Sequence, residues 1–294
     1  MIETRGLTKR FGSTEALVDF SVDVPEGAVF ALLGPNGAGK TTAIRILLNI
    51  VRADGGRASV LGCDSRKLGV PELARIGYVS ENRELPEWMR VGEFLKYCKG
   101  FYPEWRDEEA AALVKAFGLP LDRRLRSLSR GMRMKTALAS VLAYRPRLLI
   151  LDEPFSGLDV VVREGLVESI AERTPQCTVL MATHDLSDIE SFATHVGYLS
   201  EGRLLFAEEM DALVSRFREV EVLAENFPAA KLPEHWINVK QASGVLRFAD
   251  RQYDEARCER EIRELGSGVR DVTVRRLPLR SIFIALASER VSGR

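Results

Sequence analysis

Short apolar runs alternate with helical stretches along the first part of the chain. The runs AVFALLG (28–34), RLLILDEP (147–154) and CTVLMATH (177–184) predict three buried strands. Helical periodicity lies between them, beginning with TTAIRILLNI (41–50) after the first run. Strands that alternate with helices in this way predict an α/β fold with a mostly parallel sheet covered by helices.

Two later segments depart from this alternation. VGEFLKYCKGF, DEEAAALVKAFG and GMRMKTALASVLAY have helical periodicity and predict a helical insertion over about residues 82–145. Further on, EVEVLAENFP and VRDVTVRRLPL alternate like half-exposed strands, WINVKQASGVLRFAD predicts two strands around a turn, and YDEARCEREIREL predicts an amphipathic helix. We therefore expect a first domain over residues 1–214 and a small α+β appendage over residues 215–294.

The charge balance narrows the class of partner. The 294 residues contain 42 Lys plus Arg and 42 Asp plus Glu, so the net charge is zero. Nucleic-acid binding usually leaves a basic footprint, and we expect no nucleic acid as the main partner. The four cysteines form no C-x-x-C pair and the three histidines have no metal-ligand spacing, which favours free thiols over a disulfide or zinc framework.

The hydropathy pattern contains neither a secretory signal nor an apolar run long enough to span a bilayer. MIETRGLTKRFGS at the N-terminus is charged from its third residue, and LLIL (148–151) is followed at once by two acidic residues. We expect a cytoplasmic protein that reaches a membrane only through a partner.

A glycine-rich segment carries the first candidate chemistry. GPNGAGKT (34–41) matches the phosphate-loop pattern G-x-x-x-x-G-K-[ST] and lies between a predicted strand and a predicted helix. Glycines let backbone N–H groups surround a phosphate, and the helix N-terminus adds the positive end of its dipole. A lysine here reaches the β- and γ-phosphates, and the next hydroxyl ligates Mg²⁺. We assign nucleotide binding to Gly34, Asn36, Gly37, Gly39, Lys40, Thr41 and Thr42, with Thr41 as a metal ligand.

Two acidic residues end the second predicted strand. LLILDEP places Asp152 and Glu153 at its carboxyl end, which is where ligands bind in a parallel α/β sheet. Asp152 can hold Mg²⁺, directly or through water, and Glu153 can accept a proton from the water that attacks the γ-phosphate. An ordinary strand-to-loop junction would explain the pair alone, but together with the phosphate loop the pair favours hydrolysis of a nucleotide.

The segment LSRGMRMKTALASVLAYRPRLLILDEPFSGLD (128–159) resembles the ATP-binding cassette (ABC) ATPases, whose signature reads LSGGQ. Ser129 and Gly131 match the signature, whereas Arg130 and Met132 depart from it. Ser129 could also act only as an N-cap of the following helix. The two roles are compatible, because a helix N-terminus with a hydroxyl and a glycine N–H suits a γ-phosphate.

Further family motifs occur in the family's order over about residues 1–210. SGLD (156–159) resembles the D-loop, which includes Asp159. MATHD places His184 at the family's switch histidine, and KRFG places Phe11 where an aromatic ring stacks on adenine. Taken singly, Phe11 could be a core aromatic and His184 a hydrogen-bonded histidine at a strand end. The ordered set implies the ABC type of P-loop NTPase fold, with an antiparallel β subdomain and a helical insertion.

The resemblance implies a mechanism and partners. Two cassettes close head to tail around two ATP molecules with Mg²⁺, so this chain needs a second ABC ATPase subunit, in a homodimer or a heterodimer. Each ATP lies between Lys40, Thr41 and Asp152 of one chain and Ser129 and Gly131 of the other. Hydrolysis at Glu153, with His184 at the γ-phosphate, reopens the sandwich.

One position departs from the family pattern in a way that concerns catalysis. YVSENRELPEW (78–88) has Glu81 where the family has a glutamine that contacts Mg²⁺ and the attacking water. Glutamate keeps an oxygen acceptor, adds a negative charge and loses the N–H₂ donor. We expect Glu81 to act as a catalytic residue and metal ligand with altered metal dependence. The alternative is that it weakens catalysis and makes the protein an ATP-controlled clamp.

The resemblance favours the ATPase subunit of an ABC transporter at the cytoplasmic face of the inner membrane, with separate transmembrane permease subunits. The C-terminal segment LPLRSIFIALAS resembles the ending of bacterial exporter-type subunits, which favours export. The aromatic segment ENRELPEWMRVGEFLKYCKGFYPEW resembles the family's groove for a permease helix. Two alternatives stay open: a soluble ABC ATPase not linked to transport, and a weakly hydrolysing ATP-gated regulator.

Overall fold

The computed structural model describes residues 1–81, 84–172, 177–226, 232–265 and 267–292. Two residues of the expected helical insertion (82–83) and residues 227–231, 266 and 293–294 of the expected appendage lie outside the described residues. No helix within the described ranges is long and apolar enough to cross a bilayer.

The chain forms two compact units, Met1–Ala207 and Glu208–Arg294. The division lies before the boundary expected after residue 214, so that the helix α7 (Met210–Arg216) falls in the second unit. At its end, the Arg216 guanidinium donates to Glu208 Oε1 at 2.6 Å and to the carbonyl of Arg251 at 3.0 Å. Phe217, next in the chain, is fully buried.

A six-stranded sheet forms the centre of the first unit. Neighbouring strands β10 and β4, β4 and β9, β9 and β8, and β8 and β7 pair in parallel. The strand order is β11 (Arg203–Glu209), β10 (His195–Ser200), β4 (Val29–Leu33), β9 (Thr178–Thr183), β8 (Leu148–Asp152) and β7 (Ile76–Ser80). Every residue of β4, β8 and β9 is buried, which explains their uninterrupted apolar sequence. The predicted parallel α/β fold is confirmed.

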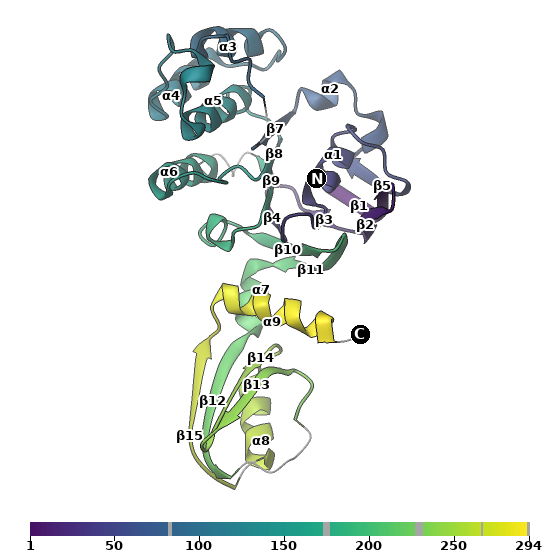
Figure 1. Ribbon diagram of the computed structural model, residues 1–294, viewed down its shortest axis with the longest axis vertical. Coiled ribbons are helices and arrows are strands. Elements are labelled where there is room, and N and C mark those ends of the chain that lie inside the picture. Colours follow the sequence, from purple (N-terminus) through teal and green to yellow (C-terminus); the bar gives the residue numbers. More distant parts are fainter. Residues whose placement is uncertain (82–83, 173–176, 227–231, 266, 293–294) are drawn as a thin grey trace. The chain divides into compact units, whose positions relative to one another are not determined.

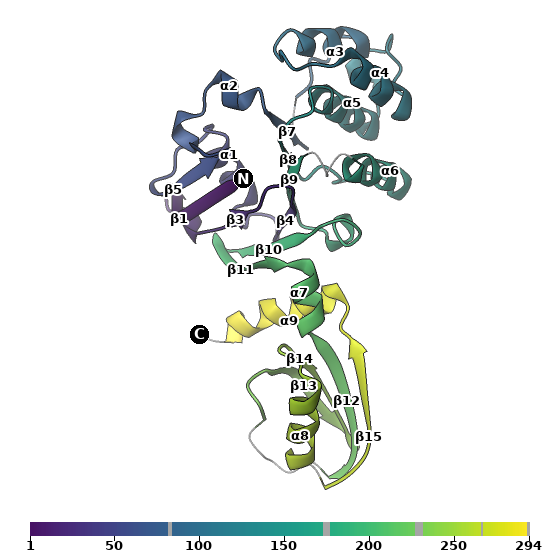
Figure 2. The same cartoon turned by 180° about the vertical axis from the view of Figure 1, so that it is seen from behind.

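Helices cover both faces of this sheet (Figures 1 and 2). The helix α1 (Lys40–Leu47) follows β4 and packs against β8 and β9 on one face. The helix α6 (Val160–Ala171) lies on the opposite face in both views. The described residues of this unit also form short helical turns: η1 (Ser65–Lys67), α2 (Val70–Leu73), η2 (Leu125–Ser127) and η4 (Leu186–Asp188).

A second sheet of the first unit is antiparallel and packs with α1. Its strands are β1 (Ile2–Phe11), β2 (Thr14–Phe20), β3 (Asp23–Val24), β5 (Gly55–Val60) and β6 (Cys63–Asp64). Its apolar face shares one core with the parallel sheet, in which Phe20 and Phe30 are each 1% exposed. The expected antiparallel β subdomain is therefore present.

Three helices form the predicted insertion: α3 (Val91–Lys99), α4 (Asp107–Ala116) and α5 (Arg130–Leu142). Tyr144, just after α5, stacks on Tyr102 with ring centroids 3.9 Å apart. The Tyr144 hydroxyl donates to the carbonyl of Ile76 at 2.9 Å. This hydrogen bond fastens the end of the insertion to the first residue of β7.

The second unit is the small α+β fold that the sequence predicts. Its antiparallel sheet has the order β13 (Trp236–Ala242), β14 (Val245–Asp250), β12 (Arg218–Asn226) and β15 (Ser267–Arg276). Positive φ at Ser243 (47°) and Gly244 (81°) forms the turn between β13 and β14. The helix α8 (Glu255–Leu265) supplies Cys258 and Ile262 to the core, and α9 (Leu279–Ser292) ends the described chain.

Truncation of Phe248 should destabilise the second unit. Phe248 is 1% exposed and stacks on Trp236 with ring centroids 3.7 Å apart. Phe248→Ala should lower the unfolding free energy of this unit by about 3–5 kcal/mol, because it leaves a cavity in a small core. Hydrogen exchange measured separately in each unit reports this loss. Val272→Ala, at a site 38% exposed, is the matched control, and equal losses for the two variants would contradict the prediction.

Candidate active site

The glycine-rich loop between β4 and α1 has the backbone that a phosphate loop requires. Gly39 has φ 107°, and a Cβ there would lie 2.3 Å from the carbonyl oxygen of Ala16. A Cβ on Gly34 would lie 2.2 Å from the carbonyl oxygen of Leu199. Only glycine fits these two positions, so the loop is fixed by close backbone contacts at both ends. Between them, Asn36 and Gly37 are exposed.

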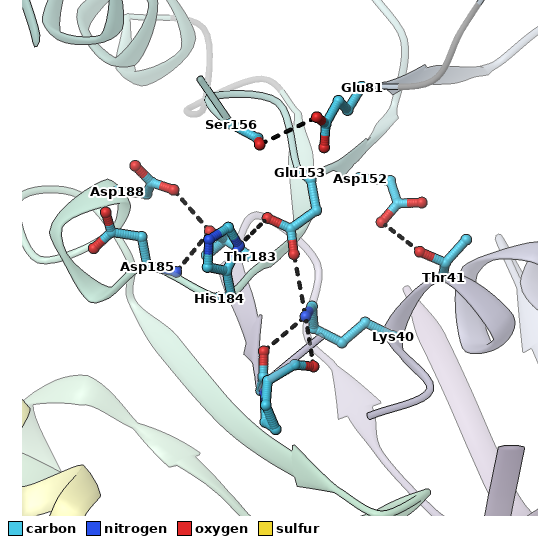
Figure 3. Close-up of polar contacts among 12 residues, drawn as sticks. Lys40, Thr41, Glu81, Asp152, Glu153, Ser156, Thr183, His184, Asp185 and Asp188 are labelled. Carbon is cyan, nitrogen blue, oxygen red and sulfur yellow. Dashed lines mark hydrogen bonds and ion pairs between the residues drawn. The ribbon is translucent and has the colours of Figure 1, made fainter. Parts of the chain in front are cut away.

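Lys40 is buried at the mouth of this loop with 5% exposure. Its ammonium donates to the carbonyl oxygens of Gly34 at 2.7 Å and Pro35 at 3.2 Å. It also forms an ion pair with Glu153 Oε1 at 3.1 Å (Figure 3). The cation is therefore held in place by three oxygen atoms, which an incoming phosphate can replace in part.

Asp152 ends β8 and faces the start of α1. The Thr41 hydroxyl donates to Asp152 Oδ1 at 3.0 Å. Burial raises the pKa of Asp152, and the neighbouring Glu153 adds to this effect, while the Thr41 hydrogen bond and Lys40 act against it. A hydroxyl and a carboxylate in contact form a set of hard oxygen donors, which fits Mg²⁺ with phosphate and water as its other ligands. Thr42, next on α1, is half-buried.

Glu153 follows with an unusual backbone. Its φ is 53°, in the left-handed region that a non-glycine residue rarely adopts. Its N–H donates to the carbonyl of Ala182 at 2.9 Å, which fixes the turn after β8. The side chain then lies between Lys40 and the imidazole of His184, whose Nδ1 is 2.7 Å from Glu153 Oε2. Figure 3 shows this chain from lysine to carboxylate to histidine.

Hydrogen bonds among residues that belong to no sequence motif hold the loop that carries His184. The Thr183 hydroxyl donates to Asp188 Oδ2 at 2.7 Å and accepts the N–H of Asp185 at 3.1 Å. Burial raises the pKa of Asp188, against the Thr183 hydrogen bond and the charge of Arg163. Arg163 Nη1 lies 3.3 Å from Asp188 Oδ1. Asp188 and Thr183 thus position the turn that begins at His184.

Glu81 directly follows β7. Its N–H donates to the carbonyl of Asp152 at 2.9 Å, which places it beside the acidic pair. Its carboxylate accepts the Ser156 hydroxyl at 3.2 Å and forms an ion pair with Arg130. The Glu81 carboxylate is thus bonded to the loop after β8 and to α5, whereas Asp152 Oδ1 accepts a hydrogen bond from Thr41 on α1.

The remaining predicted residues lie at helix starts and on the antiparallel sheet. Ser129 caps α5 and accepts the Met132 N–H at 3.3 Å, and a Cβ on Gly131 would lie 3.0 Å from Val162 Cγ1 on α6. Asp159 caps α6 and accepts the Val162 N–H at 3.0 Å. Phe11 ends β1 with half of its surface exposed, and the Lys9 ammonium lies 5.2 Å from its ring centroid.

The structure therefore brings Lys40, Thr41, Asp152, Glu153 and His184 into one connected site. The family model for ABC transporters matches residues 17–156, which include the phosphate loop and the acidic pair. The daunorubicin resistance ATP-binding protein DrrA2 of Streptomyces coeruleorubidus is 32% identical over 319 residues, covering 99% of this chain and 96% of that protein. The chain belongs to the ABC transporter ATP-binding proteins.

Other ABC proteins match over a shorter part of the chain. The sulfate/thiosulfate import ATP-binding protein CysA of Xanthomonas campestris pv. campestris is 37% identical over 217 residues, covering 70% of this chain and 62% of that protein. A solved structure described as the ATP-binding subunit of an ABC transporter has 26% identity and a TM-score of 0.67, covering 73% of this chain and 92% of that chain. The chain is thus the ATPase subunit of an ABC transporter, and it hydrolyses ATP to power transport.

Burial of the ionised Asp152 carboxylate should make this ABC ATPase less stable. A carboxyl group whose pKa is raised on folding makes the protein less stable as the pH rises through its ordinary value of 3.8 toward the higher native value. Asp152→Asn keeps an acceptor for Thr41 and cannot ionise. Thermal unfolding without nucleotide should therefore show a higher Tm for the variant, and the gain should grow above about pH 4.

Asp54→Asn is the control with the opposite sign. Hydrogen bonds from Lys9 and from the N–H of Arg10 lower the pKa of Asp54, so its removal should cost stability at neutral pH and nothing in acid. A Tm gain for Asp152→Asn that does not change with pH would show that burial of its charge is not the cause. ATP hydrolysis by Asp152→Asn should fall about 10- to 100-fold.

Proposed function

We propose that this subunit binds Mg²⁺-ATP, closes with a second cassette and powers export through separate transmembrane subunits. The ion-paired chain from Lys40 through Glu153 to His184 carries the proposal, because it joins a phosphate-binding cation to a base. A base within hydrogen-bond reach of an orienting histidine is the arrangement that activation of water needs.

Binding of the triphosphate changes the partner of Lys40. Its ammonium exchanges Glu153 Oε1 for phosphate oxygens, which are stronger partners for a buried cation. Glu153, released from the ion pair but still held by His184, is then free to accept a proton from the attacking water. Thr41 and Asp152 would hold Mg²⁺, which supplies neutralisation of charge on the β- and γ-phosphates.

The second half of the site must come from another molecule. Ser129 and Gly131 lie at the start of α5, where the Ser129 hydroxyl accepts the Met132 N–H and Gly131 lies close to Val162 and Leu158. The N–H groups at that helix start suit a γ-phosphate. The sequence contains one phosphate-loop motif and one signature segment, so two cassettes arranged head to tail complete two sites. In the simplest case the second cassette is another copy of this chain.

An exposed aromatic group on the helical insertion suits a permease. Trp88, Tyr97 and Phe101 are 69%, 54% and 59% exposed, whereas Phe94, which lies on α3 with Tyr97, is 3% exposed. Tyr97 and Phe101 meet edge to face with centroids 5.0 Å apart. Large exposed aromatic side chains close together are typical of a protein contact. We assign them to a cytoplasmic helix of the transmembrane subunit.

Export is favoured by the extent of the similarity. DrrA2, whose name includes daunorubicin resistance, aligns with nearly the whole chain, including the second unit. The import protein CysA aligns with 70% of it. The sequence of the second unit therefore groups this subunit with a resistance protein rather than with an importer.

Glu153→Gln tests the proposed closure. Without the base, hydrolysis stops while ATP still binds, so the closed pair should accumulate. Light scattering should give about 33 kDa without nucleotide, the mass of one chain being 32.8 kDa, and about twice that mass with Mg²⁺-ATP. The control is Glu153→Gln combined with Lys40→Ala, which should stay a monomer. If Glu153→Gln binds ATP and stays monomeric, the partner is a different cassette and the homodimer is wrong.

A further inference from the structure

Two departures from the family pattern lie in direct contact with each other. Glu81 stands where the family has a glutamine, and Arg130 stands where the LSGGQ signature has a glycine. In the structure the Arg130 guanidinium forms an ion pair with the Glu81 carboxylate, although 49 positions separate the two residues in sequence. The side chains are 51% and 28% exposed, respectively.

Arg130 does not stabilise the helix that it begins. It is the first residue of α5, and no acidic residue occurs in the first turn of that helix. A cation at a helix N-terminus opposes the helix dipole and therefore disfavours the helix. Its value to the protein must therefore come from its contacts outside α5.

Those contacts join three segments around one carboxylate. A Cβ on Gly157 would lie 2.6 Å from Arg130 Nη1, so the guanidinium lies directly against the backbone of the loop after β8. From the same loop the Ser156 hydroxyl donates to Glu81 Oε1 at 3.2 Å. The Glu81 N–H is bonded to the Asp152 carbonyl. Both the backbone and the side chain of Glu81 are thus fixed beside the strand end that carries the catalytic acids.

The charges at this edge explain why an arginine is needed. Glu81, Asp152 and Glu153 all lie at the strand ends beside the site proposed for a triphosphate, and the buried Lys40 is ion-paired only with Glu153 among them. An unneutralised carboxylate near the phosphates would repel them. A glutamine would cause no such repulsion, so the glutamate requires a compensating charge.

We propose that Arg130 is a positioning residue for Glu81: it neutralises the carboxylate and holds it against Ser156, so that the loop after β7 carries an acid beside the site without weakening ATP binding. The pair acts within one chain and replaces the neutral Gln and Gly of the family pattern as a unit. The inference rests on the proposed ATP site at Lys40.

A double-mutant cycle tests this pair. The variants are Arg130→Gln, Glu81→Gln and the two combined, and the readouts are the Kd of trinitrophenyl-ATP with Mg²⁺ and the KM for Mg²⁺-ATP. Arg130→Gln alone should raise both about tenfold at low salt, and added salt should shrink the effect because it screens the repulsion. In the Glu81→Gln background, the further change Arg130→Gln should alter the Kd by no more than about threefold, because the carboxylate that Arg130 neutralises is then absent.

Two further variants separate charge from structure. Arg133→Gln is the matched control, because Arg133 lies one turn further along α5 and pairs with Glu87 at 3.2 Å. It should leave the Kd unchanged. Arg130→Lys keeps the charge and should give a Kd between those of the original protein and Arg130→Gln. If Arg130→Gln fails to fold, Arg130→Lys with and without Glu81→Gln gives the same comparison in a milder form.

The outcomes are distinct. Three results would each overturn the proposal. The effects of the two substitutions could be additive, the effect of Arg130→Gln could be independent of salt concentration, or Arg130→Lys could raise the Kd as much as Arg130→Gln does. Failure of the underlying function looks different, because the unmodified chain would then not bind trinitrophenyl-ATP at all and Lys40→Ala would change nothing.

Discussion

The parallel register of four strands is the constraint on which the site depends. β4, β9, β8 and β7 pair so that Leu33 lies opposite Thr183, Asp152 opposite Ala182, and Ser80 opposite Asp152. Their carboxyl ends therefore reach one edge together, and each delivers the residue that comes next in sequence: the phosphate loop, His184, Glu153 and Glu81. Because β4, β8 and β9 are buried throughout, a slip in register would move the whole set and disrupt the core at once.

Charged side chains gather at the same edge of the sheet, and burying them lowers the stability of the fold. Lys40 is almost fully buried, Asp152 has a raised pKa because of burial, and Glu153 is held with a positive φ. Buried charges are tolerated when they are paired, and here the partners are Glu153 for Lys40 and Thr41 for Asp152. Phosphate oxygens of ATP are stronger partners for a buried ammonium than carbonyl oxygens are, so ATP binding would offset part of the cost of burying Lys40.

Much of this could be predicted from the sequence, for identifiable reasons. The strands β4, β8 and β9 are apolar throughout and end in short motifs, so their type and the chemistry at their ends were visible. The turn at Ser243 and Gly244 and the helix α8 followed from local pattern as well. What could not be predicted depends on contacts between distant segments. Asp188 supports Thr183 through a loop with no motif, and α7 has its contacts in the second unit through the Arg216 side chain.

The contact between Glu81 and Arg130 shows how such distant information changes the interpretation of a motif. Considered alone, each residue is unfavourable for ATP binding. Glu81 places a negative charge beside the phosphates, and Arg130 places a bulky cation where the signature has glycine. Considered together, they carry the same net charge as the glutamine and glycine that they replace, and they add an attraction between the loop after β7 and α5. That loop and that helix are the two elements that a nucleotide would contact from opposite subunits. The contact within one chain therefore ties the start of α5 to the strand end that carries Asp152 and Glu153.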